Sequence, residues 1–349
     1  MSTHLVTINI VVLNGEKYIR HCLGSVFNQT YPHDKIEINI IDNGSTDSTK
    51  EIIKEGLEIG NWKLEIPQIF FHEMEKNLGM WGGQEKALEF SNGKYIMALS
   101  SDVILEPKAI ENSVKILEED EKIGAVEPKI YRFELENGNV KKTNTIDTCG
   151  FKIFRSRRII NIGHGETDRG QYDNPPDGRE IFAVEGAAPF FRKTALEDCR
   201  ILGEIVDHDM WWYGDDIDLA WRMRLFGWRQ IYSPAVVAYH DRKTTHALRK
   251  SWSDFIKIRK QIPRLKRRLD YRNSRLMFVK NDYIINFVKD LPFFLKREIP
   301  LWGYFLIFEP FMILEIPKII KMIPKMLKKR KEIMKKAVTS PKEINDWLE

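Results

Sequence analysis

The stretch Ile40-Ile41-Asp42-Asn43-Gly44-Ser45-Thr46-Asp47-Ser48-Thr49 (IIDNGSTDST) joins an apolar run to a polar segment rich in turn-forming residues. The run Ile36–Ile41 has the length and composition of a buried strand. Gly44 favours a tight turn, and the Ser and Asp side chains after it can cap a helix, which we expect at Ser48–Gly56. This is a strand–turn–helix connection, in which Asp42 is either a turn residue or an acceptor of hydrogen bonds from a nucleobase or ribose.

The same alternation of strand and helix patterns continues on both sides of this stretch. Further strands are predicted at Val6–Leu13, Ile66–His72, Tyr95–Leu99 and Val236–His240, and further helices at Glu16–Gln29, Gln84–Phe90 and Asp216–Phe226. Such alternation implies βαβ units and a mostly parallel sheet covered by helices. Ligands of these sheets bind at the carboxyl ends of the strands. Asn14, Asp42 and Asp102 each lie just beyond such an end.

Two other regions differ from this alternation. Between Glu134 and Glu180 the residues Gly, Asn, Asp and Pro dominate, so we expect long loops over the sheet, followed by regular structure at Ile181–Phe191. Beyond Asp241 the pattern is helical, basic and interrupted by prolines. We therefore divide the chain into an α/β domain, residues 1–241, and a helical region, residues 242–349.

Composition narrows the class of protein. An apolar fraction of 43% with 11% aromatic residues excludes a disordered chain. Cys22, Cys149 and Cys199 are far apart and without metal-finger spacing, which favours a reducing compartment over a disulfide framework. The first apolar run has only a strand's length and no basic residues or cleavage site around it. We therefore expect a cytoplasmic protein that begins with a strand.

Three more stretches place polar residues or glycines at expected strand or helix ends. NLGMWGGQEKAL, residues 77–88, has three glycines before a helix, which permit close approach of a ligand, but it is neither a Walker loop nor a GxGxxG motif. MALSSDVILEP, residues 97–107, has the lone carboxylate of Asp102 after a strand. A Ser and Asp turn at a strand end explains this stretch equally well.

The third stretch is YGDDIDLAWRMRLFGW, residues 213–228, in which Asp215, Asp216 and Asp218 fall within four positions. Three carboxylates are too costly to bury together unless cations or donors compensate them. At a helix start the dipole alone would favour them. With Arg222 and Arg224 one turn or more along, the segment can also supply a catalytic base and a diphosphate-binding group.

Together these segments resemble the family 2 glycosyltransferases with a GT-A nucleotide-sugar-binding fold, and especially their rhamnosyltransferase-like members. The resemblance rests on VTINIVVLNGEKYIRHCLGSVFNQTYP, INIIDNGSTDST, NLGMWGGQEKAL, ALSSDVILEP, VEGAAPFFRKTAL, YGDDIDLAWRMRLFGWRQIYSP and the His of VVAYH. It covers residues 5–241 in one order. YRNSRLMFVKNDYIINFVKDLPFFLKREI also resembles the tail of the rhamnosyltransferase-like members.

The resemblance implies an inverting transferase that moves a sugar from a nucleotide-diphosphate sugar, with dTDP-rhamnose among the candidates, to a hydroxyl group. The implied acceptor is a glycan or a polyprenyl-diphosphate-linked saccharide of cell-surface polysaccharide synthesis, and no nucleic acid is involved. The implied base is Asp216, with Asp215 as the alternative. The implied donor-binding residues are Val12, Asn14, Asp42, Asn43, Gly79, Gly83, Ser101, Asp102, Gly186 and Arg222.

The family's acidic motif, often Asp-x-Asp, binds a divalent metal through its last aspartate, and Ser100-Ser101-Asp102 keeps only that residue. His240 matches a metal-ligand histidine of the family. The resemblance therefore implies Mg²⁺ or Mn²⁺ at Asp102 and His240. One carboxylate holds such a cation weakly, so diphosphate oxygens and water must supply most of the ligands.

The C-terminal region combines apolar and basic segments. Leu301–Leu314 is apolar but shorter than the ~20 residues of a spanning helix, and from Lys318 to Lys336 there are nine Lys or Arg and one acid. This pattern predicts a segment peripheral to the inner face of the cell membrane, attracted to anionic lipid. The alternative is a pair of helices packed on the catalytic domain with a solvated lysine face. On the first reading, a chain truncated before Ile299 is expected to keep donor binding.

Two other functions stay open at the level of sequence. A nucleotidyltransferase shares an α/β nucleotide-binding core, but it would carry a basic Gly-rich loop near the N-terminus, of which VVLNGEKY is a poor version. A non-catalytic protein that docks on membranes and binds nucleotide sugars is favoured by the serines at positions 100 and 101. Hydrolysis of a nucleotide sugar with and without Mn²⁺ separates these functions.

Overall fold

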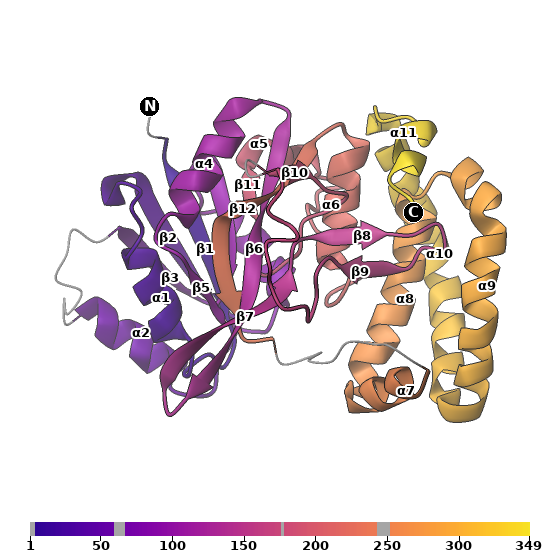
Figure 1. Cartoon of the computed structure of the whole chain (residues 1–349), viewed down its shortest axis with the longest axis horizontal. Coiled ribbons are helices and arrows are strands. Elements are labelled where there is room, and N and C mark those ends of the chain that lie inside the picture. The colour runs from indigo at the N-terminus through magenta and orange to yellow at the C-terminus, as the bar shows by residue number, and fades with distance from the viewer. Residues whose placement is uncertain (1–3, 59–66, 176–177, 243–251) are drawn as a thin grey trace.

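The computed structural model describes residues 4–58, 67–175, 178–242 and 252–349, and its centre is a ten-stranded sheet (Figure 1). The strand order is β10-β12-β6-β11-β4-β1-β2-β3, with β5 paired to β12 and β7 paired to β6. The strands are β1 Val6–Val12, β2 Ile36–Asp42, β3 Gln68–Glu73, β4 Tyr95–Ser100, β5 Val103–Leu105, β6 Ile123–Glu136, β7 Asn139–Thr148, β8 Phe151–Ile153, β9 Ile159–Asn161, β10 Arg179–Glu180, β11 Phe190–Arg192 and β12 Arg229–His240. Strands β8 and β9 form a separate hairpin.

Helices follow most of the strands. They are α1 Ile19–Phe27, α2 Thr49–Glu58, α3 Met80–Leu88, α4 Ala109–Glu119, α5 Lys193–Asp198, α6 Asp215–Leu225, α7 Trp252–Gln261, α8 Arg264–Asn281, α9 Ile284–Phe308, α10 Glu315–Lys336 and α11 Pro341–Asp346, with short 3-10 helices η1 His33–Lys35 and η2 Pro310–Leu314. Gly227 follows α6 with φ +84°, so the predicted helix stop is confirmed.

The parallel half of the sheet brings several strand ends to one edge. Strands β3, β2, β1 and β4 are parallel, and the register pairs Val12 with Asp42 and Val11 with Ser100. All residues of β1 and β2 are buried, as expected for central parallel strands. The prediction of a mostly parallel sheet flanked by helices is confirmed.

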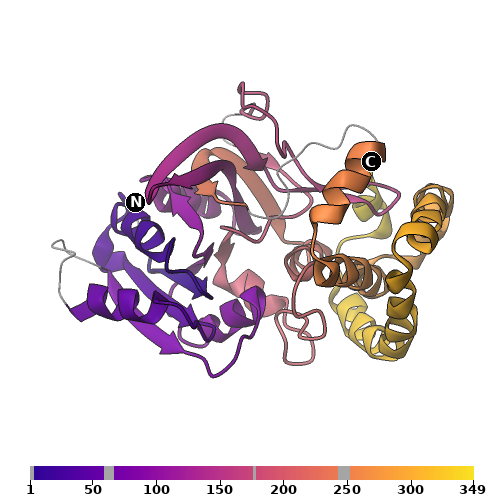
Figure 2. The same ribbon diagram turned by 90° about the horizontal axis from the view of Figure 1, so that it is seen from below.

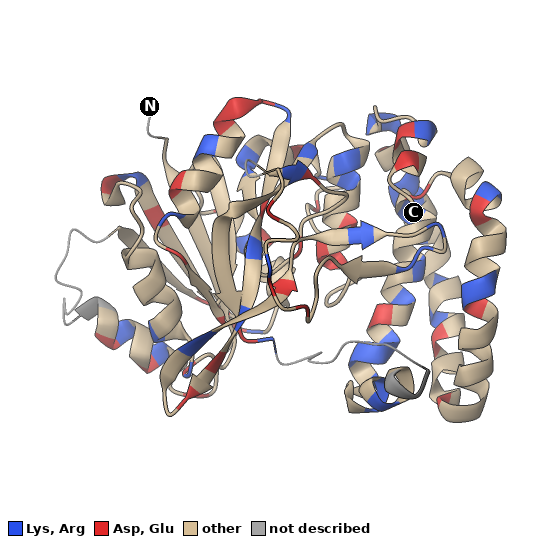
Figure 3. Cartoon of the chain, in the orientation of Figure 1, with Lys and Arg blue, Asp and Glu red and all other residues tan. Residues whose placement is uncertain are grey.

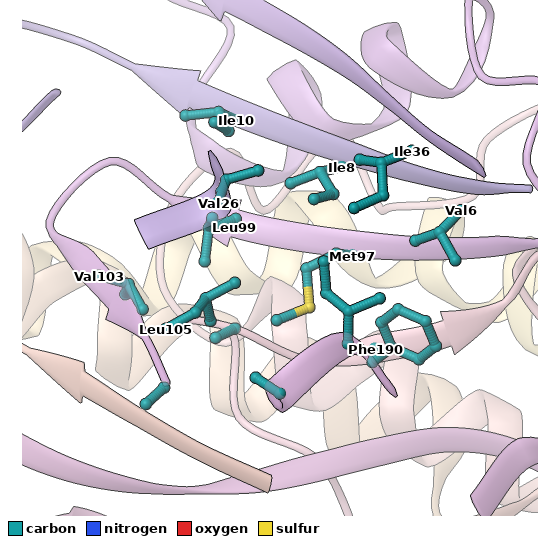
Figure 4. Packing of buried hydrophobic residues seen from close by; sticks show 14 of the residues in the cluster. Val6, Ile8, Ile10, Val26, Ile36, Met97, Leu99, Val103, Leu105 and Phe190 are labelled. Carbon is teal, nitrogen blue, oxygen red and sulfur yellow. The ribbon is translucent and has the colours of Figure 1, made fainter. Parts of the chain in front are cut away.

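Both faces of the sheet carry a hydrophobic core. On one face, alternate residues of β1, β2 and β4 pack with α1 and α4, as the cluster around Ile8, Met97 and Leu99 shows (Figure 4). On the other face, Ile96 and Ala98 pack with α3, α5 and α6. Successive side chains of β4 pack alternately into the two cores, so packing on both faces fixes the position of this strand and of the loop that follows it.

The loops predicted between Glu134 and Glu180 are partly strands. Strands β6 and β7 form a long hairpin whose turn is Asn137-Gly138, with φ values of 50° and 80°. Positive φ at both residues is the geometry for which Asn-Gly is favoured, so that dipeptide was the available sequence signal. Two other expected elements differ in extent. The regular structure expected at Ile181–Phe191 is limited to the start of β11. The strand expected at Val236–His240 is longer and begins at Arg229.

The C-terminal region is helical, as predicted, and its helices pack together against one side of the α/β core (Figures 1 and 2). After α10 the chain returns to α6, where the amides of Val338 and Thr339 donate to the carbonyl of Leu225. Leu348 then pairs with Ile153 of β8 and is buried in the same cluster as α6. Truncation before Ile299 would uncover this cluster, so donor binding by such a chain, which stays a prediction, would require the α/β region to fold without it.

Within the described ranges, no single helix is long and apolar enough to cross a membrane. Helix α9 and the segment Pro310–Lys336 pass that test of length and composition only as a pair, bent by 112°.

Candidate active site

The loops after β1 and β2 are tied together at the strand edge. The Asn14 amide donates to the Ser45 hydroxyl (2.9 Å), and the Asn14 side chain accepts from the Thr46 amide (2.8 Å). The Asn43 amide donates to the Val12 carbonyl (2.8 Å). Val12, Asn14 and Asn43 are thus brought together as predicted, and Asn14 adopts a φ of 51° to make the connection.

Asp42 lies at the base of these loops and is fully buried. Its carboxylate accepts from the Ser45 amide (3.1–3.2 Å), and the Lys50 ammonium lies 3.6 Å away. A buried carboxylate with a lysine nearby remains able to accept a further hydrogen bond from a ligand. The position fits the predicted contact with a base or ribose.

Gly79 and Gly83 begin α3 beside this edge. A Cβ on Gly79, which has φ +82°, would lie 2.5 Å from the Trp211 carbonyl oxygen, and one on Gly83 would lie 2.8 Å from Val11. The Asn43 side chain donates to the Gly79 carbonyl (2.9 Å). Close packing therefore explains both glycines, and it sets the first turn of α3 against the end of β1.

Asp102 follows β4 on the short turn to β5. Its carboxylate accepts from the Ser100 hydroxyl (2.5 Å), and Ser101 lies against Gly15 of the β1 loop. Burial opposes ionisation of Asp102, but the charge and hydrogen bond of His240, with the bond from Ser100, outweigh it and lower the pKa of the carboxyl to about 2. Asp102 is therefore an anion at neutral pH.

His240 ends β12 and faces Asp102. Its Nε2 lies 3.6 Å from Asp102 Oδ2, and its Nδ1 lies 2.9 Å from Asp147 Oδ2. Burial disfavours the charged imidazole, but Asp102 and Asp147 outweigh it and raise the pKa of His240 to about 10. A carboxylate on the outer nitrogen of a histidine is the usual support of a metal ligand.

Asp102 and His240 are the residues that would hold a divalent cation, and their facing atoms, Asp102 Oδ2 and His240 Nε2, lie 3.6 Å apart. Because the pKa of His240 is about 10, its imidazole would have to lose the Nε2 proton before it could bind a metal. In the part of the chain that the structure describes, no group of three or more His, Cys, Asp or Glu side chains could hold a metal. The two protein ligands would therefore need diphosphate oxygens and water to complete the coordination.

Asp216 lies across the site, in the first turn of α6. It packs on Gly186, where a Cβ would lie 3.0 Å from Asp216 Oδ2. Burial and the neighbouring Glu185 carboxylate raise the pKa of Asp216 to about 7. Asp215 is buried to 6% exposure, and burial and Asp216 hold its pKa well above the usual range.

Arg242 connects the two sides of the site. Its guanidinium donates to Asp147 (2.7 and 2.9 Å) and to Glu185 Oε1 (2.7 Å). Glu185 Oε2 in turn accepts from the Ala187 amide (2.8 Å). The sequence patterns did not single out Asp147, Glu185 or Arg242, because each lies in an irregular segment or strand end with no spacing that indicates chemistry.

Lys266 on α8 is a further cation near this network. Its ammonium lies 4.1 Å from the centre of the Tyr213 ring, and burial, followed by the charge of Arg242, lowers the pKa of Lys266 to about 8. The C-terminal helices thus contribute a basic side chain next to Arg242 and Glu185.

Arg222 does not reach this edge of the sheet. It is buried at 2% exposure, and its guanidinium donates to the carbonyls of Cys199 and Ile205 (both 2.6 Å) and pairs with Asp218 (3.2 Å). Its position does not support the predicted donor role, because the helix turns this residue into the core. The Asp218 carboxylate likewise forms ion pairs within the core, with Lys280 (2.8 Å) and with Arg222.

With this geometry established, comparisons with known proteins are informative. The sequence model described as "Glycosyl transferase family 2" matches residues 7–198, which is more than half of the chain. The chain belongs to glycosyl transferase family 2. This membership does not support the nucleotidyltransferase alternative.

Named relatives agree with that membership. The chain is 33% identical over 156 residues to "Uncharacterized glycosyltransferase MJ1057" of Methanocaldococcus jannaschii, covering 44% of this chain and 51% of that protein. It is 33% identical over 253 residues to "Glycosyltransferase GlyA" of Streptococcus pneumoniae, covering 71% and 32%. The chain thus spans a third to about half of these relatives' lengths.

Solved structures share the fold. Staphylococcus aureus TarS 1-349 in complex with UDP-GlcNAc matches with a TM-score of 0.52 at 15% identity, over 98% of this chain and 90% of that one. GalNAc-T7 with UDP, GalNAc and Mn²⁺ matches with a TM-score of 0.56 at 14% identity, over 79% and 51%. The fold is therefore GT-A-like, with a mostly parallel curled sheet and a C-terminal helical region.

Proposed function

We propose that the chain is a metal-dependent, inverting glycosyltransferase that moves a sugar from a nucleotide-diphosphate sugar to a hydroxyl group. The observation that carries this proposal is the placement of the Asp102–His240 pair and the Asp216 carboxyl around one strand edge in a family 2 chain. The nucleotide sugar bound by TarS and the UDP and Mn²⁺ bound by GalNAc-T7 support the donor class. Rhamnose stays the proposed sugar on the resemblance alone.

The donor would lie along the edge from β2 to β4. Asp42 would accept hydrogen bonds from the base or ribose, with Val12, Asn14 and Asn43 forming the adjoining wall. The diphosphate would lie near Ser101 and Asp102, and the sugar near Gly79, Gly83 and Gly186. When bound, a Mg²⁺ or Mn²⁺ ion held by Asp102 and His240 would neutralise negative charge on the leaving diphosphate.

Asp216 would act as the general base. As the acceptor oxygen forms its bond to the anomeric carbon, the Asp216 carboxylate takes the hydroxyl proton, while the bond from that carbon to the diphosphate oxygen breaks. A pKa of about 7 suits this step, because the group is ionised in part near neutral pH and still basic. Asp215 is the alternative base, but it is more deeply buried.

The proposed acceptor is a glycan or polyprenyl-diphosphate-linked saccharide at an anionic membrane. Relatives include "Poly-beta-1,6-N-acetyl-D-glucosamine synthase" of Staphylococcus epidermidis, 25% identical over 228 residues, which covers 65% of this chain and 47% of that protein. The polysaccharide that this relative makes, according to its name, supports a role in polysaccharide synthesis, which we place at the cell surface. Residues 1–241 would perform the transfer, and residues 242–349 would support and dock them.

Helix α9 supports the membrane part of the proposal because most of its exposed side chains are apolar, while the part of the helix up to Glu298 buries charged groups. Asp290 pairs with Arg155 and Arg157 (both 2.7 Å), and Glu298 pairs with Arg275, whereas Tyr304 and Phe305 near the end of the helix pack in a hydrophobic cluster. The outward apolar side chains of α9 are largely exposed at Ile284 (67%), Ile285 (67%), Val288 (62%), Ile299 (66%), Leu306 (61%) and Ile307 (72%). Figure 3 shows this helix, at the right edge, with few charged positions. A large exposed apolar face marks a surface that contacts lipid or another protein.

Only some of the basic side chains between Lys318 and Lys336 are free to contact a membrane. Lys329 is buried and pairs with Glu204, Asp207 and Asp209, while Lys325 and Lys336 pair with Asp209 and Asp198. Lys321, Lys328 and Lys331 are exposed and have no carboxylate partner among the described residues. These three lysines, with Lys289 and Lys296 on α9, are the proposed contacts with anionic lipid.

An assay of released nucleotide tests the proposed function. Purified protein is incubated with UDP-, dTDP- and GDP-sugars in Mn²⁺ or EDTA, with and without lipid extract as acceptor. We expect one donor to be consumed in Mn²⁺, faster with acceptor, and far more slowly in EDTA. Consumption of none would favour the non-catalytic binding protein, provided that a donor still binds.

A further inference from the structure

A cavity of about 730 Å³ lies beside the candidate active site. Its walls are the β8–β9 hairpin, helix α7 and the C-terminal residues Trp347 and Glu349, and Arg242 closes one side. Arg242 also binds Asp147 and Glu185, so the cavity and the catalytic network share one side chain. The volume is within the range of small-ligand sites, about 300–1,000 Å³.

One part of the lining is apolar. Five apolar side chains line the cavity and are partly exposed: Ile160 in β9, Ile162 just after it, Ile258 in α7, Ile262 just after that helix, and Trp347 near the C-terminus. Apolar side chains that remain in contact with solvent gain stability when an apolar ligand covers them. The lining therefore favours a ligand with a hydrocarbon part.

The charged part of the lining has an excess of cations, with Lys152, Arg158, Arg179, Arg242 and Arg259 beside the carboxylates Glu166, Glu180 and Glu349. Lys152 and Arg259 pair with Glu349 and Glu309, but Arg158 and Arg179 have no carboxylate partner within the described part of the chain. The contacts of the Arg158 and Arg179 guanidinium groups are with aromatic rings: Phe154 for Arg158, and Tyr172 and Tyr232 for Arg179. Guanidinium groups without a carboxylate that line an open cavity are suited to bind phosphate oxygens.

The cavity also connects the two surfaces that the proposed function requires. The turn between β8 and β9, which carries Arg158, is tied to α9 by the Arg155–Asp290 and Arg157–Asp290 pairs. Figure 1 shows this hairpin reaching from the sheet toward the C-terminal helices. The opposite side of the cavity is Arg242, next to Glu185, whose charge acts on Asp216.

We propose that this cavity is an acceptor subsite that binds an isoprenoid diphosphate. The diphosphate lies against Arg158 and Arg179, the first isoprene units lie on Ile160, Ile162, Ile258 and Ile262, and the attached saccharide extends past Arg242 toward Asp216. The inference rests on the proposed glycosyl transfer, and it locates the acceptor that the transfer requires.

The test is a titration with farnesyl diphosphate, a soluble isoprenoid diphosphate, followed by calorimetry on the full chain. Farnesol and inorganic diphosphate separate the apolar and ionic contributions. We expect farnesyl diphosphate to bind at least about tenfold more tightly than either. The variants Arg158→Glu and Arg179→Glu should each weaken it about tenfold or more. The matched control is Arg169→Glu, an exposed arginine of the nearby loop that does not line the cavity.

Thermal unfolding verifies that each variant is folded, and Ile258→Trp, which fills the cavity without a charge change, should weaken binding independently. Equal binding by the wild type and all of these variants would overturn the inference, as would farnesyl diphosphate binding no more tightly than inorganic diphosphate.

Donor hydrolysis without acceptor keeps the two proposals distinguishable. It should be unchanged in Arg158→Glu and Arg179→Glu, because neither residue lies at the donor edge. Donor hydrolysis by a protein that does not bind farnesyl diphosphate would overturn the cavity alone. Specific binding of farnesyl diphosphate by a wild type that turns over no donor would overturn the proposed function and leave the isoprenoid diphosphate site standing.

Discussion

Asp216 and Asp218 lie two residues apart on α6, yet their carboxyl groups have different surroundings. Asp218 is fully buried between Lys280 and Arg222, while Asp216 lies against Gly186 beside another carboxylate, Glu185. An ion-paired carboxylate is held ionised and has little basicity to offer, whereas one beside a like charge retains its proton to higher pH. The structure therefore separates a structural aspartate from a candidate base within one turn of helix.

Replacing Asp216 with Asn should lower kcat by about 10²–10⁴, the usual contribution of a positioned general base. The amide has nearly the same shape but cannot take a proton, so donor binding should stay within about threefold of the wild type. Steady-state kinetics and donor titration measure the two quantities. The corresponding Asp215→Asn variant serves as the control, and a wild-type kcat in Asp216→Asn would transfer the role to Asp215 or another group.

The pH dependence of turnover should report the same carboxyl. Burial, followed by the charge of Glu185, raises the pKa of Asp216 to about 7, while Arg242 and the backbone amides of Ile217 and Gly186 oppose the shift. Asp215 and Glu127 are further carboxyl groups whose charges interact with Asp216. A base must be ionised to act, so kcat should rise with pH up to about 7 and then level off. A kcat that falls as pH increases from 6 to 8 would contradict this assignment.

Sequence patterns located part of the site. Asn14, Asp42 and Asp102 were predictable because strand ends of a parallel sheet meet at one edge, and His240 and Asp216 because they match motifs of the family. Asp147, Glu185 and Arg242 were not, because their proximity depends on the long β6–β7 hairpin and on loop conformations. Arg222 was misplaced because a sequence motif does not show which side of a helix faces the core.

At the scale of elements, α9 presents mostly apolar residues outward and buries charged groups in the part up to Glu298. Substituting Ile284, Val288 and Ile299 together with Gln should strongly reduce sedimentation with anionic liposomes at low salt, because three outward side chains lose their apolar contact without any change of charge. Leu202→Gln is the matched control, since Leu202 is 51% exposed in a loop outside the C-terminal helices. Wild-type protein that stays in the supernatant would show that another partner covers this face.

Helices α8 and α10 hold the loop that precedes α6. Lys280 of α8 pairs with Asp207 and Asp218, and Asn273 donates from one amide to the carbonyls of Met210, Trp212 and Tyr213 (each 2.8 Å). This contact determines the conformation of residues 210–214, which lead directly into Asp215 and Asp216.

Lys280→Met should destabilise the fold by about 3–5 kcal/mol, since it leaves two buried carboxylates short of a cation. Chemical denaturation measures this loss. Lys325→Met removes a lysine that is 55% exposed and pairs with Asp209, so it should cost about 0–1 kcal/mol. Equal stability of the two variants would show that the buried pair does not anchor the loop.

The repetitive elements were predictable and the irregular ones were not. Strands β1, β2 and β4 and helix α6 lie where apolar runs and helix-stop residues place them, because local pattern and burial agree there. The β6–β7 hairpin was read as loop because its polar, solvent-facing residues obscure the alternation of a strand. The buried charges of α9 could be recognised only once its ion pairs with the β8–β9 turn were known.

At the scale of the whole molecule, the C-terminal helices are part of the catalytic unit. Buried residues of α8, α10 and the last segment, including Met277, Ile333 and Leu348, belong to the same hydrophobic cluster as α6. Charge and hydropathy patterns identified 242–349 as helical and basic, but they could not show this packing, which joins residues more than a hundred positions apart. Contact with a membrane through α9 would therefore be transmitted directly to the loop before Asp216.

The central claim is that Asp102 and His240 bind a nucleotide diphosphate through a divalent cation. Calorimetric titration with UDP, dTDP and GDP in Mn²⁺ and in EDTA tests it most directly. We predict that one nucleotide binds at least about tenfold more tightly in Mn²⁺, and that Asp102→Ala removes this gain while leaving the weak binding in EDTA unchanged. Equal affinity in Mn²⁺ and EDTA for the wild type, or equal weakening of Asp102→Ala in both, would contradict the claim.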